Sequence, residues 1–310
     1  MQTLTEIKAM LASRGIHPRK RFGQNFLVDH QKLSQIVEAS GIGEGDLILE
    51  VGPGTGVLTE RLLEVGATVI ACEIDRDMCA ILRDRLGPHE RFTLIEGDVM
   101  AGKHGLAPDV ASVLRLPPPP GEGWGRGSSD RHDPCDDCKS TSATPPHPSS
   151  PQGGGAKTFS LIANLPYNIA SPLLATLALD WPTMQRAVVM IQKEVGDRII
   201  SPPGVKAYGP LSIVMQLAFE IERIATLPPG CFWPAPQIDS VVLRCDRRAT
   251  PMTDDMPTVV DLAQRLFQQR RKQIGSTLGR DRTYPPGIEP TMRPEQLTVD
   301  QFIALAQESD

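Results

Sequence analysis

The chain has 310 residues, a net charge of −5 and 40% hydrophobic residues, which is enough for one large domain and a smaller one. It has no apolar run of about 18 residues, so a membrane-spanning helix is not expected, and its first ten residues do not resemble a secretory leader. The six cysteines are scattered, which is typical of a cytoplasmic protein rather than a disulfide-stabilised one.

The predicted elements alternate between helix and strand up to residue 95. Residues 1–39 are predicted to be helical apart from a break at 15–25, and Asp29 is placed to cap the second helix. Short apolar strands are predicted at 47–51, 68–72 and 92–95, with helices at 57–65 and 76–86 between them. This alternation is typical of a parallel sheet covered by helices on both faces.

The pattern stops over residues 115–157, which contain consecutive prolines, a glycine-rich stretch and a Ser/Thr/Pro-rich stretch. Such a composition buries too little apolar surface to offset its chain entropy, so a surface insertion without stable structure is predicted. Cys135 and Cys138, with His132 and His147 nearby, have ligand-like spacing. Because no second cysteine pair accompanies them, we predict no metal site.

The alternation resumes at residue 159 and ends near residue 246. Strands are predicted at 159–163, 187–191, 218–225 and 238–245, and helices at 172–179 and 194–200. Residues 259–269, 274–278 and 294–306 are then predicted to be helical. We therefore predict an α/β fold with a Rossmann-like sheet domain over residues 1–246 and a small helical C-terminal domain over residues 247–310.

A glycine-rich loop, residues 50–56, follows the first sheet strand. Gly52 and Gly54 would let the backbone approach a ligand without a clashing Cβ. Glu73 ends the next strand about 20 residues later, where a carboxylate can accept ribose hydroxyls. Asp98 follows the third strand and can accept a hydrogen bond from an adenine amine. Because no Walker-type motif occurs, these residues predict an adenosine-containing cofactor rather than a phosphate-rich one.

The tetrapeptide Asn164-Leu165-Pro166-Tyr167 ends the strand predicted at 159–163. The amine of adenine is a poor nucleophile because its lone pair is delocalised into the ring. The Asn164 oxygen and a nearby backbone carbonyl can each accept one amine hydrogen and hold the nitrogen closer to tetrahedral geometry. Pro166 stiffens such a loop, and Tyr167 can stack on a base. The motif therefore predicts a class I methyltransferase that uses S-adenosylmethionine and acts mainly by positioning.

A second aromatic stretch, residues 231–236, precedes the last strand. Its rigid prolines could present Phe232 to the other face of a flipped base. Alternatively, Phe232 packs in the core under a loop, and the sequence leaves both interpretations open.

Basic residues gather in two places although the chain is acidic overall. One cluster is Arg14, Arg19, Lys20 and Arg21, and the other is Arg265, Arg270, Arg271 and Lys272. An acidic chain argues against a nucleic-acid partner in general. The two clusters are nevertheless compatible with a local phosphate-binding surface, as well as with ordinary solvated faces.

Seven motifs occur in order along nearly the whole chain apart from the insertion. They are Arg21–Leu27, Glu50–Gly56, Asn164–Ile169, Gln192–Val195, Tyr208–Ser212, Phe232–Ser240 and Arg270–Lys272. In this set the sequence resembles the ribosomal RNA adenine dimethyltransferases of the KsgA type. The sequence departs from that family in the insertion between Asp98 and Asn164, and in Gln237, which stands where a lysine is usual.

The resemblance implies dimethylation of two adjacent adenosines in a hairpin loop near the 3′ end of small-subunit (16S) rRNA. It also implies a seven-strand methyltransferase domain. We expect a cytoplasmic monomer, without membrane contact, that acts on an assembling 30S particle. Matched by motif, the cofactor would contact Asn25, Leu27, Gly52, Gly54, Glu73, Asp98 and Asn164. The reaction would use Asn164, Leu165, Pro166, Tyr167 and Phe232, with Tyr167 and Phe232 enclosing the adenine.

Four other functions fit the sequence less well. A large-subunit adenosine methyltransferase of the macrolide-resistance type shares the fold, but residues 208–212 and 232–240 favour the small-subunit enzyme. DNA adenine methyltransferases normally carry Asn/Asp-Pro-Pro-aromatic, which Leu165 does not match. A non-catalytic RNA-binding factor would be indicated by loss of Asn164, Glu73 or the glycine loop, all of which are present. The glycine spacing disfavours a nicotinamide oxidoreductase.

Overall fold

The computed structural model describes residues 2–19, 22–102, 105–115 and 158–308. Lys20, Arg21 and nearly all of the predicted insertion lie outside the described residues. The candidate metal ligands Cys135, Cys138, His132 and His147 lie outside them too, so that prediction stays untested.

Within the described residues, seven strands form a central sheet in the order β4-β3-β2-β5-β6-β9-β7. They are β2 (Leu47–Val51), β3 (Thr68–Glu73), β4 (Phe92–Glu96), β5 (Phe159–Asn164), β6 (Met184–Gln192), β7 (Phe219–Leu227) and β9 (Ser240–Arg247). Neighbours from β4 to β6 pair in parallel, whereas β9 pairs antiparallel with β6 and β7. The strand order reverses direction at β2, which makes this the topological switch point where open α/β sheets bind ligands.

The remaining elements are helices and one short pair of strands. The helices are α1 (Leu4–Ser13), α2 (His30–Ser40), α3 (Val57–Glu64), α4 (Arg76–Leu86), α5 (Pro108–Arg115), α6 (Ala170–Asp180), α7 (Lys193–Ile200), α8 (Pro210–Ala218), α9 (Met256–Phe267), α10 (Gly275–Leu278) and α11 (Val299–Gln307). The short strands β1 (Phe26–Leu27) and β8 (Phe232–Trp233) pair with each other. As predicted, the Asp29 side chain caps α2, where it accepts a bond from the Lys32 backbone N–H at 3.0 Å.

Two hydrophobic cores lie on opposite faces of the sheet because neighbouring strand residues point in opposite directions. Ile48 packs with α1, α2, α3 and α4, whereas Leu49 packs in the core that contains α5, α6 and α8. Ile162 and Leu161 divide in the same way. The central strands are therefore buried on both faces, which explains their continuous apolar runs.

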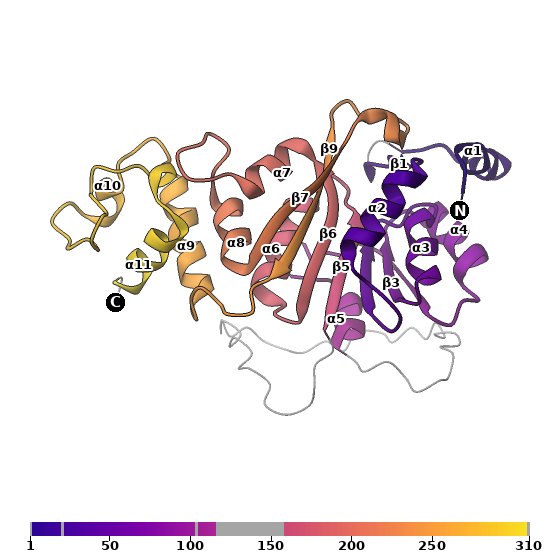
Figure 1. The fold of residues 1–310 in the computed structure, drawn as a ribbon, viewed down its shortest axis with the longest axis horizontal. Helices are drawn as coiled ribbons and strands as arrows, with labels where there is room; N and C mark the ends of the chain where they lie inside the picture. The colour runs from indigo at the N-terminus through magenta and orange to yellow at the C-terminus, as the bar shows by residue number, and fades with distance from the viewer. Residues whose placement is uncertain (1, 20–21, 103–104, 116–157, 309–310) are drawn as a thin grey trace, which may run out of the picture.

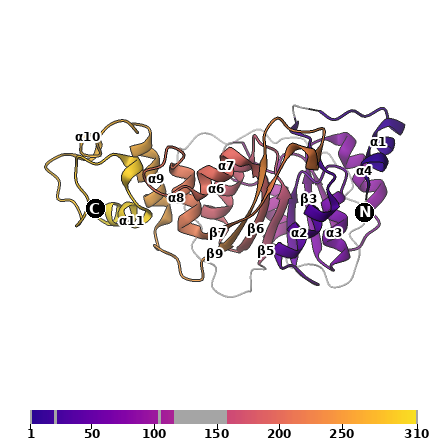
Figure 2. The same ribbon diagram turned by 45° about the horizontal axis from the view of Figure 1, so that its top comes forward.

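The C-terminal helices α9, α10 and α11 lie at one end of the molecule, and the N-terminus lies at the other (Figures 1 and 2). Apolar residues of α9 and α11, among them Leu262 and Phe302, join the core that covers one face of the sheet. The predicted division at residues 246 and 247 stays a proposal. In the part of the chain that the structure describes, no helix is long and apolar enough to cross a membrane.

Helices α5 and α8 and the paired strands β1 and β8 were not predicted. Helix α8 begins at Pro210, where the backbone N–H of Gly209 donates to the Ser212 hydroxyl at 3.0 Å. Its residues are apolar nearly throughout, so their periodicity does not distinguish a helix from a strand. The strands β1 and β8 are too short to give a pattern, and each exists only because the other is present.

Candidate active site

One cavity lies at the carboxyl ends of β2, β3 and β5. All seven residues predicted to contact the cofactor line it, namely Asn25, Leu27, Gly52, Gly54, Glu73, Asp98 and Asn164. Pro166 also lines it, together with Glu50 and Met190, which the sequence analysis did not assign to the site. Segments far apart in the chain therefore converge on one cavity, although no contact with a cofactor is itself observed.

The glycine loop forms the floor of this cavity. Gly52, Gly54 and Gly56 have φ angles of 70°, 59° and 84°, a region in which other residues are strained. A Cβ on Gly54 would lie 2.9 Å from the Phe26 ring, which covers the loop. The loop therefore requires glycine for its own backbone. It also requires glycine for the close approach of the N-terminal segment, which we define as the described residues between α1 and α2.

Glu73 ends β3 and is 6% exposed. Its carboxylate accepts backbone N–H bonds from Gly54 at 3.1 Å and from Asp75 at 2.9 Å. Burial raises the pKa of Glu73 above its usual value, and these two N–H bonds oppose that rise. The carboxylate is thus held in place at the cavity wall, where it can accept bonds from a ribose.

Asp98 is exposed and lies just after β4 in the same lining. Its Oδ1 accepts the backbone N–H of Met100 at 3.0 Å. One carboxylate oxygen is therefore fixed by the loop, and the group remains accessible from the cavity.

Asn164 ends β5, and its orientation is set by a distant segment. Its Nδ2 donates to the backbone carbonyl of Asn25 at 2.8 Å. The Asn25 side chain in turn donates to the Gly23 carbonyl at 3.2 Å. Because the amide nitrogen of Asn164 is engaged, its Oδ1 is the atom available as an acceptor.

The rest of the tetrapeptide divides between core and surface. The Leu165 side chain is 1% exposed and packs in the core, so only its backbone can serve the site. The Pro166 carbonyl accepts the N–H groups of Ile169 and Ala170 at the start of α6, both at 3.2 Å. Tyr167 is partly exposed, and its backbone lies close to Gly23.

Phe232 lies in β8, directly opposite Leu27 in β1. Its side chain is 4% exposed and belongs to the core that contains α1 to α4. The neighbouring Trp233 stacks on Phe26, with ring centroids 6.3 Å apart. This burial matches core packing, while the predicted enclosure of adenine by Tyr167 and Phe232 stays a prediction.

Glu50, at the end of β2, is the buried acid that sequence reasoning overlooked. It is 2% exposed, and its Oε2 accepts the Thr59 hydroxyl at 2.7 Å. Burial raises the pKa of Glu50 to about 8, and the nearby Glu73 carboxylate adds to the rise. Its place as the first residue of the Glu50–Gly56 motif was the available signal.

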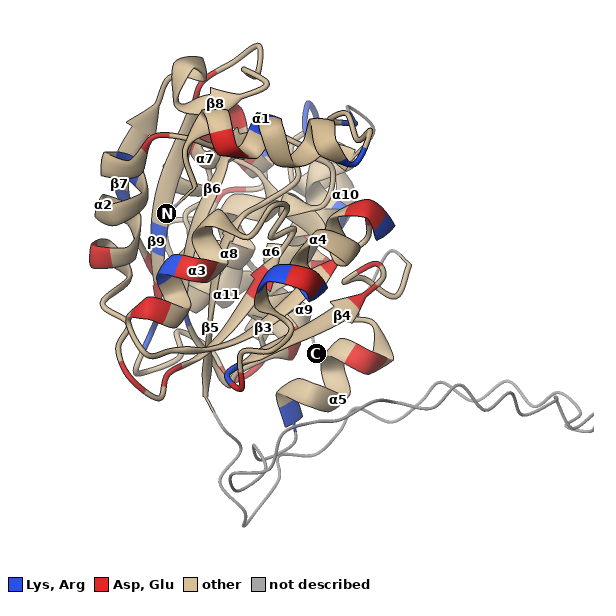
Figure 3. Cartoon of the chain, turned by 90° about the vertical axis from the view of Figure 1, so that its right-hand side faces the viewer, with Lys and Arg blue, Asp and Glu red and all other residues tan. Residues whose placement is uncertain are grey.

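The two basic clusters behave differently. Arg14 pairs with Asp84 at 2.8 Å, and Arg19 pairs with Asp75 at 2.9 Å and with Asp77 at 2.5 Å. On the side of the molecule that carries α3 and α4, basic and acidic residues are interspersed along the chain (Figure 3). The described arginines of the N-terminal cluster therefore form ion pairs with carboxylates of the same protein.

The C-terminal cluster is more open. Arg270 lies 3.6 Å from the Glu295 carboxylate, whereas Arg265, Arg271 and Lys272 are exposed. In the described part of the chain these three make no ion pair. Arg198, Lys206 and Arg270 line a groove between α7 and α9. Among the described residues no cluster of three His, Cys, Asp or Glu side chains could hold a metal ion.

The cavity residues fit S-adenosylmethionine. The positive φ angles of its glycines let the loop turn sharply beside the cavity, and Glu73 is a buried acceptor at a strand end. Bound there, the cofactor would supply an electrophilic methyl group on a sulfonium.

Comparison with known proteins identifies the relatives of this chain. A protein of Synechococcus sp. (strain WH7803), described as Ribosomal RNA small subunit methyltransferase A, is 35% identical over 311 residues, which cover 94% of each chain. A protein of Bifidobacterium adolescentis with the same description is 33% identical over 324 residues, covering 98% of this chain and 93% of the relative.

Solved structures share the fold at lower identity. A dimethyladenosine transferase from Plasmodium falciparum has a TM-score of 0.63 at 20% identity, and the match covers 90% of this chain and 95% of that one. The 23S rRNA methyltransferase ErmE has a TM-score of 0.59 at 21% identity, with 91% and 98% covered. The family model described as Ribosomal RNA adenine dimethylase matches residues 16–310. The chain therefore belongs to the ribosomal RNA adenine dimethylase family, whose members are S-adenosylmethionine-dependent methyltransferases.

Proposed function

We propose that this enzyme dimethylates two adjacent adenosines in a hairpin loop near the 3′ end of 16S rRNA. The observation that carries the proposal is the Asn164 carboxamide, which lines the cavity with Gly52 and Glu73 and is held by the Asn25 carbonyl at 2.8 Å. The names of the curated relatives support the small subunit as the source of the RNA.

In the proposed mechanism, the chain positions the target amine and does not transfer protons through a strong base. Asn164 Oδ1 accepts one amine hydrogen. The Leu165 carbonyl accepts the other, since the Pro166 carbonyl is already engaged by α6. Both bonds strengthen as the nitrogen gains positive charge in the transition state, which is where binding accelerates a reaction. A singly methylated amine retains one hydrogen, so it can still engage one acceptor for the second transfer.

For the cofactor we propose that Glu73 accepts the ribose hydroxyls and Asp98 accepts the adenine amine. Asn25 and Leu27 would cover the cofactor from the N-terminal side, and Gly52 and Gly54 would allow its close approach. Tyr167 is partly exposed and would stack on the flipped base.

We propose that the substrate is an assembling 30S particle, bound by a monomer in the cytoplasm. Base flipping costs least where the target is already unpaired, as in a hairpin loop. The exposed residues Arg265, Arg271 and Lys272 and the groove between α7 and α9 offer few phosphate contacts. Few contacts mean a shallow salt dependence, so the shape of a structured particle must supply the remaining specificity.

The test is methylation of purified particles followed by mass spectrometry of the nucleosides. We expect dimethyladenosine in 30S particles that lack this modification, and inert duplex DNA. Methylation of 50S particles instead would favour the large-subunit alternative. A product that stops at monomethyladenosine with the cofactor in excess would contradict the proposal.

A further inference from the structure

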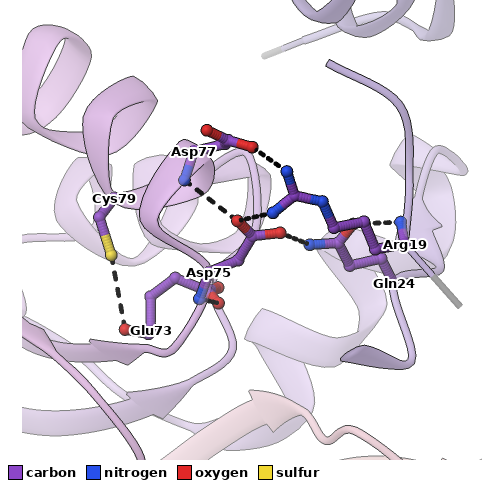
Figure 4. Close-up of polar contacts among 6 residues, drawn as sticks. All are labelled: Arg19, Gln24, Glu73, Asp75, Asp77 and Cys79. Atoms are coloured by element: carbon purple, nitrogen blue, oxygen red, sulfur yellow. Dashed lines mark hydrogen bonds and ion pairs between the residues drawn. The ribbon is translucent and has the colours of Figure 1, made fainter. Parts of the chain in front are cut away.

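Asp75 lies outside the cavity lining, yet its carboxylate is fully buried. Figure 4 shows the donors that surround it. Arg19 Nη1 donates to Oδ1 at 2.9 Å, and Gln24 Nε2 donates to Oδ2 at 2.8 Å. The backbone N–H of Asp77 also donates to Oδ1, at 3.0 Å. Bonds to a charged acceptor are the strong ones, so the start of α4 anchors the N-terminal segment firmly.

Arg19 and Gln24 bind each other, and Arg19 also binds a second carboxylate at the start of α4. The backbone N–H of Arg19 donates to Gln24 Oε1 at 2.7 Å, and Arg19 Nη2 reaches Asp77 Oδ2 at 2.5 Å. The Gln24 side chain is thus fixed at both ends, by Arg19 and by Asp75. Its backbone leads directly to Asn25, the residue whose carbonyl holds Asn164.

Hydrogen bonds of Asp75 therefore connect Glu73, the proposed acceptor for the cofactor, to the segment that holds Asn164. On one side its backbone N–H donates to Glu73 Oε1 at 2.9 Å. On the other side its carboxylate holds Gln24, next to the carbonyl that receives Asn164 Nδ2. A displacement of Gln24 would move the Asn25 carbonyl. The Asn164 amide could then rotate and turn its nitrogen toward the target amine, which needs an acceptor.

We propose that Arg19, Gln24 and Asp75 are positioning residues that set the orientation of the Asn164 carboxamide through the Asn25 carbonyl. The inference rests on the proposed function, because it takes Asn164 Oδ1 as the acceptor of the target amine. It also gives Arg19 a role other than RNA binding.

The test compares single-turnover rates at saturating cofactor and RNA for Arg19→Ala and Gln24→Ala. We expect each variant to lower the rate by about tenfold, which is the scale of one hydrogen bond to a charged group. Asp84→Ala is the matched control, because it breaks the Arg14–Asp84 pair between the same N-terminal region and α4 without touching Asp75. This control should keep the wild-type rate. Asp75→Ala is avoided, since Asp75 also caps α4.

A double-mutant cycle separates positioning from a merely structural role. Asn164→Asp keeps an acceptor but removes the donor to the Asn25 carbonyl, so Gln24→Ala should cause little further loss in that background. Because Arg19 and Gln24 share one carboxylate, their double variant should also lose less than the product of the single effects. Arg19→Lys should restore part of the rate that Arg19→Ala loses.

Multiplicative losses in both cycles, or a wild-type rate for Gln24→Ala, would overturn the inference. The proposed function fails by a different result, namely near wild-type turnover in Asn164→Ala. Loss of turnover in Asn164→Ala together with an unaffected Gln24→Ala would contradict only the positioning role.

Discussion

The two walls of the cavity are built in different ways. One wall, called the cofactor wall after its proposed role, consists of the loops after β2, β3 and β4, and its Glu73 carboxylate is fixed by backbone N–H groups within that same part of the chain. The other wall, called the base wall after its proposed role, depends on partners from far away in the sequence, since Asn164 is held by Asn25, and the segment that follows Asn25 is paired in turn with β8. The first wall can form locally, whereas the second needs three distant segments to come together. Substitutions in the two walls should therefore fail differently.

Asn164→Ala should have the largest effect. It removes the proposed acceptor at the reacting nitrogen, so we expect kcat to fall about a hundredfold or more, a scale known for lost transition-state hydrogen bonds. Cofactor affinity should largely survive, because Glu73 and the glycine loop are unchanged. Steady-state kinetics and calorimetry measure the two effects separately. Equal losses in kcat and in cofactor affinity would contradict the separate roles proposed for the two walls.

Glu73→Ala and Asp98→Ala should weaken cofactor binding. Each removes an acceptor worth about 1.5–3 kcal/mol, or roughly tenfold to a hundredfold in Kd. Isothermal titration with S-adenosylmethionine measures this loss, and circular dichroism verifies folding. Unchanged affinity in both folded variants would remove these residues from the cofactor wall.

Tyr167→Ala and Phe232→Ala distinguish base stacking from core packing. Tyr167 is partly exposed, so its loss should weaken capture of the RNA base by about 1–3 kcal/mol and leave the melting temperature nearly unchanged. Phe232 is 4% exposed, so its truncation should lower the stability of the fold by about 3–5 kcal/mol. A stable Phe232→Ala enzyme with impaired RNA binding would instead favour the stacking role.

Glu50→Gln should change how stability depends on pH. Burial raises the pKa of Glu50 from 4.5 to about 8, so in this range the folded protein retains a proton that the unfolded chain releases. The free energy of unfolding of the wild type should therefore fall as pH rises through this window. Glutamine cannot ionise and keeps an oxygen for Thr59. As pH rises from about 5 to about 8, the variant should therefore become more stable relative to the wild type. Urea unfolding at about pH 5 and about pH 8 tests this, and parallel profiles would contradict it.

Deleting residues 117–155 should have the smallest effect. The described chain stops at Arg115, at the end of α5, and resumes at residue 158, just before β5. The site lies at the opposite, carboxyl end of β5, where Asn164 is located. Methylation assays and melting curves of the shortened protein measure the effect. Loss of folding or activity would mean that the segment contributes to the enzyme.

The cofactor wall could be predicted from the sequence because its signals are local. The glycine spacing and the acids at two strand ends were enough to assign Gly52, Glu73 and Asp98 to one cavity, and the structure brings them together there. The strand pattern likewise predicted β2 with the same first and last residues that the structure shows.

The contacts of the base wall could not be predicted in the same way. The bond from Asn164 to a backbone carbonyl cannot be inferred from the residue types, because every residue has such a carbonyl. The pairing of Leu27 with Phe232 involves strands of two residues, which are too short to give a pattern. Arg19 was grouped with neighbouring basic residues, although its partners Asp75 and Asp77 lie in another element. Charge patterning along the chain does not reveal such pairing in space.

The pairing of β1 with β8 has a consequence for the timing of synthesis. A ribosome adds about 5–20 residues per second, so roughly 10–40 seconds separate the emergence of Leu27 from that of its partner Phe232. During this interval the N-terminal segment has no strand to join. Long-range contacts of this kind also form late in folding, because closing the long intervening loop costs conformational entropy before the contacts stabilise the fold. A nascent chain that still lacks β8 therefore leaves β1 without its partner strand, so Leu27, which lines the cavity, gains this support only after residue 232 has been made.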